Sequence, residues 1–204
     1  YENANLSMVA GLLTRTISDD LGKFTAEQAA AQIVREDDPH LSPTTLVAVE
    51  NTTNRGGGAC WEYYELENIA GLCRQHRMRL HCDGARIFNA CVATNIEVRH
   101  YARCCDTLCF CLSKGLGAPA GSILAGDRET LHKALRFRKM LGGGMRQAGI
   151  LAAAGLYALE HHLPDLKEDH RRARAFRRAL EAEGVNFCLP SPTNILYLKA
   201  ADPA

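Results

Sequence analysis

The sequence lacks an excess of charge of either sign, and it lacks any long apolar run. Its 24 Lys and Arg residues face 23 Asp and Glu residues, which leaves a formal net charge of +1. Electrostatics therefore give no reason to expect nucleic acid or an anionic membrane as a partner. No apolar run approaches the roughly 20 residues that span a bilayer. We expect a globular protein that binds neither nucleic acid nor a membrane.

A secretory signal and paired cysteine motifs are also missing. We expect a cytoplasmic protein, with mitochondria left open because Tyr1 rather than methionine begins the sequence. The nine cysteines form no C-x-x-C pair and show no zinc-finger spacing, and most lie inside apolar stretches. This pattern favours reduced, structural cysteines over a disulfide framework or a metal site. Neither G-x-G-x-x-G nor G-x-x-x-x-G-K-[ST] occurs, so dinucleotide and P-loop sites lose their main support.

Strand-like and helix-like segments alternate along the chain. The runs typical of strands are 44–50, 78–83, 107–112 (expected to be fully buried) and 121–126. Apolar residues at helical spacing occur at 62–76, 127–140 and 147–162, and a capping box of Thr25 and Gln28 begins another helix. The alternation predicts an α/β fold with a largely parallel sheet, whose sites lie at the carboxyl ends of the strands.

The character of the sequence changes after His162. A long charged helix is expected at 165–184, followed by two short strands at 185–190 and 193–200. We predict a partial large domain over 1–162 and the beginning of a small α+β domain over 163–204. The arginines of the charged helix are interleaved with Ala and Phe, which favours a solvated helix face over a nucleic-acid patch.

Reactive side chains follow several of the expected strands. Asp83 ends one strand, with Arg86 three residues later, and Lys114 follows the most apolar strand in "CLSKGLGAP". Two Gly-rich stretches accompany them: "ENTTNRGGG" from residue 50, and "LGGGMRQAG" from residue 141 with Arg146. A lysine nucleophile, a carboxylate for a pyridine nitrogen and an arginine for an anionic group are what pyridoxal phosphate needs from a protein.

The same stretches, in this order and spacing, closely resemble the motifs of low-specificity L-threonine aldolases, which are pyridoxal-phosphate enzymes of fold type I. The resemblance implies that Lys114 forms the aldimine with the cofactor, Asp83 faces the pyridine nitrogen, and Arg86 binds substrate carboxylate or a cofactor oxygen. It implies that Arg146 reaches the cofactor phosphate of a neighbouring subunit, so that a homo-oligomer, a tetramer in the family, is expected. The reaction implied is retro-aldol cleavage of L-threonine or L-allo-threonine to glycine and acetaldehyde.

Two departures from the family pattern bear on activity. Thr53 stands where the family usually has a histidine near the substrate hydroxyl, and a threonine cannot act as a base near neutral pH. The resemblance also implies that the chain is truncated at both ends, without a Ser/Gly/Thr phosphate loop, a histidine that stacks on the cofactor and a C-terminal arginine for the substrate. Two alternatives therefore stay open: an inactive remnant of the fold, and a related β-eliminating lyase that acts on aromatic amino acids.

Overall fold

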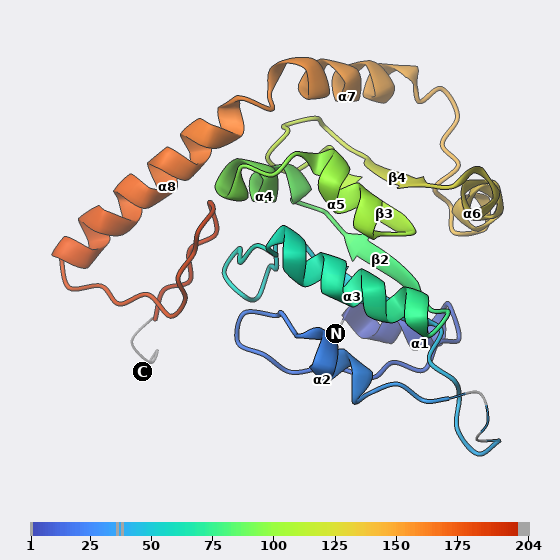
Figure 1. Ribbon diagram of the computed structural model, residues 1–204. Helices are drawn as coiled ribbons and strands as arrows, with labels where there is room; N and C mark the ends of the chain where they lie inside the picture. The colour runs from blue at the N-terminus through green and yellow to red at the C-terminus, as the bar shows by residue number, and fades with distance from the viewer. Residues whose placement is uncertain (1, 36, 38, 200–204) are drawn as a thin grey trace.

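The structure is a computed structural model that describes residues 2–35, 37 and 39–199 (Figure 1). A single 3-10 turn, Glu2–Ala4, precedes the first helix. The helices are α1 (Asn5–Met8), α2 (Ala26–Ala30), α3 (Tyr63–Gln75), α4 (Ile87–Thr94), α5 (Val98–Cys104), α6 (Arg128–Met140), α7 (Gly149–His161) and α8 (Asp165–Ala182). The strands are β1 (Leu46–Glu50), β2 (Arg79–Asp83), β3 (Thr107–Cys111) and β4 (Ser122–Gly126). The predicted α/β alternation is confirmed.

The four strands form one sheet in the order β1-β2-β3-β4. β1 and β2 pair in parallel, as do β2 and β3, whereas β3 and β4 are antiparallel. The sheet is thus mostly parallel, as expected. The carboxyl ends of β1, β2 and β3 consequently meet at one edge of the sheet.

The main core lies between β1–β3 and the helices α3, α4 and α5 (Figure 1). Its fully buried members include Leu66 and Ile69 of α3, Leu80 of β2, and Tyr101 of α5. Apolar residues at helical spacing give α3 a buried face. A second cluster joins the turn after β3 to α7 and α8, through side chains that include Leu112 and Leu166. α8 is therefore anchored to the end of β3 at its first turn.

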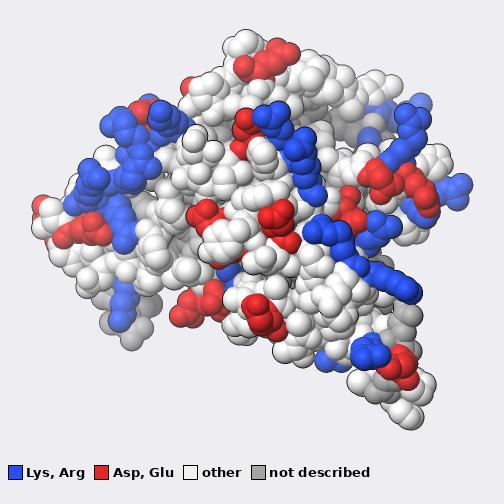
Figure 2. Space-filling model, in the orientation of Figure 1, with Lys and Arg blue, Asp and Glu red and all other residues white. Residues whose placement is uncertain are grey.

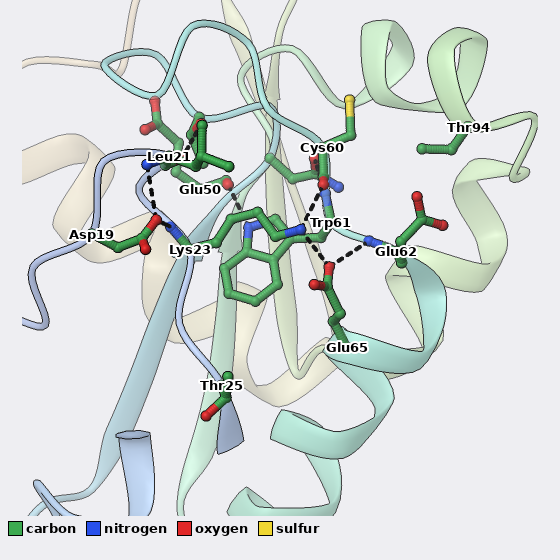
Figure 3. Close-up of polar contacts among 12 residues, drawn as sticks. Asp19, Leu21, Lys23, Thr25, Glu50, Cys60, Trp61, Glu62, Glu65 and Thr94 are labelled. Atoms are coloured by element: carbon green, nitrogen blue, oxygen red, sulfur yellow. Dashed lines mark hydrogen bonds and ion pairs between the residues drawn. The ribbon is translucent and has the colours of Figure 1, made fainter. Parts of the chain in front are cut away.

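Trp61 closes the core at the carboxyl end of β1 (Figure 3). Its side chain is fully buried, and the indole Nε1 donates a hydrogen bond to the Glu50 carbonyl at 2.9 Å. Phe24 meets the indole edge-on with ring centroids 5.4 Å apart. The Lys23 amine lies 5.5 Å from the ring centroid and pairs with Glu65 at 2.6 Å. These contacts join residues 23–24 to β1 and α3.

The face formed by β4 and α6 is largely uncovered. All five residues of β4 are exposed, and α6 has no buried residue. A pocket of about 1200 Å³ opens here between β4, α6 and the start of α7. The expectation of a fully buried strand at 107–112 is consequently wrong, because within β3 only Leu108 is buried. Cys109 of β3 lines the open pocket.

The C-terminal region also differs from the expectation. Strands at 185–190 and 193–200 were expected, and in the described part of this region only an isolated bridge joins Phe187 to Leu198. Two hydrogen bonds flank the bridge, from the Cys188 N–H to the Tyr197 carbonyl and from the Lys199 N–H to the Asn186 carbonyl. The prediction of two strands is wrong because an isolated pair of short segments is marginally stable in water.

The described ranges contain no helix with the length and apolarity needed to cross a bilayer. All nine cysteines are free thiols.

Candidate functional site

The parallel register brings acidic strand ends together. Glu50 at the end of β1 is the register partner of Asp83 at the end of β2, and Asp83 is the partner of Cys109 in β3. Lys114 follows the end of β3 by three residues. Of the side chains predicted from the sequence, Asp83, Arg86 and Lys114 therefore lie at or shortly after strand ends on the edge where an α/β sheet places its ligand site.

The turn after β2 fixes the position of Asp83. Its Oδ1 accepts a hydrogen bond from the Ala85 N–H at 3.0 Å and lies 3.6 Å from the Cys109 thiol. The Gly84 N–H donates to the Cys109 carbonyl at 2.8 Å, and a Cβ on Gly84 would lie 2.7 Å from that same oxygen. Only glycine permits this approach of the turn to β3. Within the described part of the chain, the Oδ2 of Asp83 accepts no hydrogen bond, so this oxygen is available to a ligand.

Lys114 has a fixed backbone and an exposed side chain. Its carbonyl accepts the Gly117 N–H at 2.9 Å, and Gly117 has a φ of 72° that favours glycine. The next residue, Gly115, packs so closely on Leu166 of α8 that an added Cβ would lie 2.7 Å from it. The turn therefore holds Lys114 in place while its amine remains exposed.

Glu50 completes a group that we call the strand-edge cluster: Glu50, Asp83, Arg86 and Lys114. Burial raises the pKa of the Glu50 carboxyl above its ordinary value of 4.5, while the Asn54 N–H lowers it with a hydrogen bond at 3.0 Å. The Asp83 carboxylate raises the pKa of Glu50 further. The cations of Arg86 and Lys114 lower it. Asp83, Arg86 and Lys114 thus all act electrostatically on Glu50.

Sequence reasoning did not select Glu50 as a site residue. The signal that could have found it is the one that selected Asp83, because Glu50 is also the last residue of an expected strand. Two neighbouring parallel strands that both end in a carboxylate place these groups side by side.

Replacing Glu50 by glutamine is expected to flatten the dependence of thermal stability on pH. A carboxyl whose folded-state pKa is raised contributes stability that is present below about pH 4.5 and is lost as pH rises through the folded pKa. The Tm of Glu50→Gln minus that of the wild type should therefore increase from pH 4.5 towards neutrality. Calorimetric scans at several pH values measure this Tm difference, and Glu183→Gln, at an exposed position, is the control. A Tm difference that stays constant with pH would contradict a raised pKa of Glu50.

Thr53 and Arg146 lie apart from the strand-edge cluster. Thr53 is fully buried, and its hydroxyl donates to the Leu21 carbonyl at 2.7 Å. Arg146 is exposed in the segment between α6 and α7. In the ranges that the structure describes, no ion pair or hydrogen bond joins Arg146 to the strand-edge cluster. Their roles in binding substrate and a neighbouring cofactor stay predictions.

The chemistry of the strand-edge cluster fits pyridoxal phosphate. An exposed primary amine, a carboxylate with one free oxygen and a guanidinium are the groups that can engage its aldehyde, its pyridine nitrogen and an anionic substituent. Among the described residues, no group of three or more His, Cys, Asp or Glu side chains could hold a metal ion.

Comparisons with known proteins agree with this chemistry. The family model of the beta-eliminating lyases matches residues 1–202. The chain is 43% identical over 172 residues to the low specificity L-threonine aldolase of Escherichia coli K12, covering 84% of the chain and 50% of that protein. It is 39% identical over 199 residues to a probable low-specificity L-threonine aldolase of Schizosaccharomyces pombe, covering 97% of the chain and 52% of that protein.

A solved structure shows the same fold. The crystal structure of a putative L-allo-threonine aldolase from Listeria monocytogenes superimposes with a TM-score of 0.84 at 21% identity, over 97% of this chain and 54% of that one. The chain thus spans about half the length of the relatives that it matches. The chain belongs to the beta-eliminating lyase family and has the α/β fold of its threonine aldolase relatives.

Proposed function

We propose that the chain belongs to a pyridoxal-phosphate-dependent lyase that cleaves L-threonine or L-allo-threonine to glycine and acetaldehyde. The observation that carries the proposal is the parallel register, which places Glu50 beside Asp83 and brings the end of β3, three residues before Lys114, to the same edge of the sheet. The names of the relatives support the substrate class. Because the chain spans about half of their length, the activity of the whole protein is part of the proposal.

Each residue of the proposed site has one task. The Lys114 amine would hold the cofactor through its aldehyde, and the free Oδ2 of Asp83 would accept a hydrogen bond from the N–H of its protonated pyridine ring. Arg86 binds the substrate carboxylate or a cofactor oxygen, and Thr53 lies on the side of the substrate hydroxyl. Arg146, exposed on its loop, serves the phosphate in a neighbouring subunit of a homo-oligomer. When bound, the cofactor supplies an electron sink for the charge left on Cα.

The domain boundary at residues 162 and 163 is part of the proposal. α8 begins at Asp165, the Asn89 amide of α4 contacts His170 of α8 at 3.1 Å, and Leu166 of α8 packs in one cluster with Leu112. The second unit is therefore expected to dock on the first through α8.

A catalytically inactive remnant is the second candidate function. The observation that favours it is the Thr53 hydroxyl, which donates to the Leu21 carbonyl and is fully buried. A side chain held in this way supplies no base for the substrate hydroxyl.

Product analysis separates the candidates. The chain is incubated with excess pyridoxal phosphate and either L-threonine or L-allo-threonine, and glycine and acetaldehyde are quantified. Equal amounts of both products, above a sample without protein, are the expected result. L-tyrosine serves as a parallel substrate, since formation of a 2-oxo acid and ammonia from it would indicate β-elimination instead. Absence of every product over long incubation would favour the remnant.

A further inference from the structure

A second pocket opens at the opposite, amino-terminal edge of the sheet. Its volume is about 470 Å³, and it lies among the ends of α3 and α5 and the segments that enter β2 and β3. No member of the strand-edge cluster lines it. Its size falls in the range of about 300 to 1,000 Å³ that is typical of small-molecule sites.

Four arginines line this pocket, which we call the arginine pocket: Arg74 on the last turn of α3, Arg77 just after α3, Arg79 at the start of β2, and Arg103 on the last turn of α5. Asp106 is the only carboxylate among the lining residues, and it pairs with Arg79 at 2.5 Å. The remaining three guanidinium groups form no ion pair with any residue that the structure describes. They are available to an external anion.

Opposing charges act on part of the pocket. The C-termini of α3 and α5 each carry about half a negative charge, and Arg74 and Arg103 stand where cations stabilise such ends. Asp106 pairs with Arg79, and the carboxylates of Asp127 and Glu129 also act on Arg79. The positive charge left for a ligand is therefore that of Arg74, Arg77 and Arg103. Figure 2 shows Lys and Arg side chains gathered over the region where α3 and α5 end.

Helix stabilisation does not account for Arg77. It follows the C-cap His76 with a φ of 54°, in the left-handed region where glycine is favoured. The Met78 N–H donates to the Cys73 carbonyl at 2.8 Å and the Arg77 N–H donates to the Arg74 carbonyl at 3.3 Å, which is the Schellman pattern. A residue with a Cβ costs about 1–2 kcal/mol in this conformation. Arg77, which lines the pocket, therefore has a strained backbone conformation.

Two of the three thiols that line the pocket, those of Cys73 and Cys104, are not reactive groups. Burial is the main cause that raises the pKa of Cys73 and of Cys104 to about 11. Both thiols stay neutral near pH 7, where the thiolate is the nucleophile. They form an apolar floor beneath the arginines, which suits binding rather than covalent chemistry.

We propose that the arginine pocket binds a small molecule that carries a phosphate or diphosphate group. Guanidinium groups bind phosphate oxygens through two parallel hydrogen bonds, and three of the exposed arginines that line this one pocket form no ion pair within the described residues. The net charge of +1 gives the chain no general attraction for nucleic acid. The pocket is separate from the proposed cofactor site, so this inference does not depend on the proposed function.

The test uses inorganic pyrophosphate as the probe and isothermal titration calorimetry as the measurement. We expect saturable binding with a Kd of about 1 mM or tighter. Arg77→Gly should weaken binding about tenfold or more, while its Tm stays equal to that of the wild type or rises because the strain is relieved. Arg77→Asn should weaken pyrophosphate binding as much as Arg77→Gly does, since asparagine also tolerates this backbone conformation but lacks the guanidinium group.

Matched variants isolate the pocket. Asn95→Gly relieves a similar φ of 57° after α4 without removing a charge, and Arg178→Ala removes an exposed charge from α8. Both should bind pyrophosphate with the wild-type Kd, as should Lys114→Ala, which alters the proposed cofactor site. A Kd for Arg77→Gly within twofold of the wild type, or citrate binding as tightly as pyrophosphate, would overturn the proposal. Absence of saturation up to about 10 mM would do so as well.

Discussion

Replacing Lys114 by alanine is expected to abolish covalent attachment of pyridoxal phosphate to the chain. The alanine has no nitrogen that could bond to the cofactor aldehyde. The wild-type chain is mixed with the cofactor, reduced with borohydride and digested. Mass spectrometry should then find the cofactor on the peptide that contains Lys114, and the variant should show no label above background. If the intact protein cleaves threonine, kcat should fall by at least about a hundredfold.

The fold should survive this substitution. The Lys114 side chain is exposed, and its contact in the turn is made by the backbone carbonyl, which alanine retains. The free energy of unfolding should change by less than about 0.5 kcal/mol. Lys133→Ala is the matched control, because this lysine is exposed on α6 and pairs with Glu129. Equal labelling of the Lys114→Ala chain and the wild type would refute the assignment, whatever the activity.

Strand ends were the part of the site that the sequence could predict. Asp83 and Lys114 each follow an apolar run, and a parallel sheet places such positions on one edge whatever the details of packing. The register of β1 and β2 then brought Glu50 beside Asp83. Periodicity identifies a strand and its end, but the electrostatic partners of a side chain depend on which strand lies next to it.

The arginine pocket is the opposite case. Its arginines are spread from Arg74 to Arg103, and no motif joins them. They converge because α3 and α5 both end beside the starts of β2 and β3. The expectation that 107–112 is fully buried is wrong for a related reason. An apolar composition predicts burial on both faces of a strand, but burial requires a covering element on each side of the sheet.

Trp61→Ala is expected to lower the free energy of unfolding by about 3–5 kcal/mol. The indole is fully buried between residues 23–24 and the end of β1, so truncation leaves a large cavity and removes the hydrogen bond to the Glu50 carbonyl. A domain of ordinary stability has only about 5–15 kcal/mol in total. Chemical denaturation followed by circular dichroism measures the loss. Trp61 is the single tryptophan, so its fluorescence reports on unfolding only in chains that keep it.

Two further variants test the origin of this effect. Tyr64→Ala removes an aromatic ring that is 62% exposed in the first turn of α3. It should change the free energy of unfolding by less than about 0.5 kcal/mol. Trp61→Phe keeps an aromatic ring without the N–H donor, so its loss should lie between those of the two alanine variants. If Trp61→Ala and Tyr64→Ala were equally destabilising, burial of the indole would not be the origin of the loss. The Glu50 backbone is held both by the pairing of β1 with β2 and by the hydrogen bond from the Trp61 indole, and therefore the core helps to place one carboxylate of the strand-edge cluster.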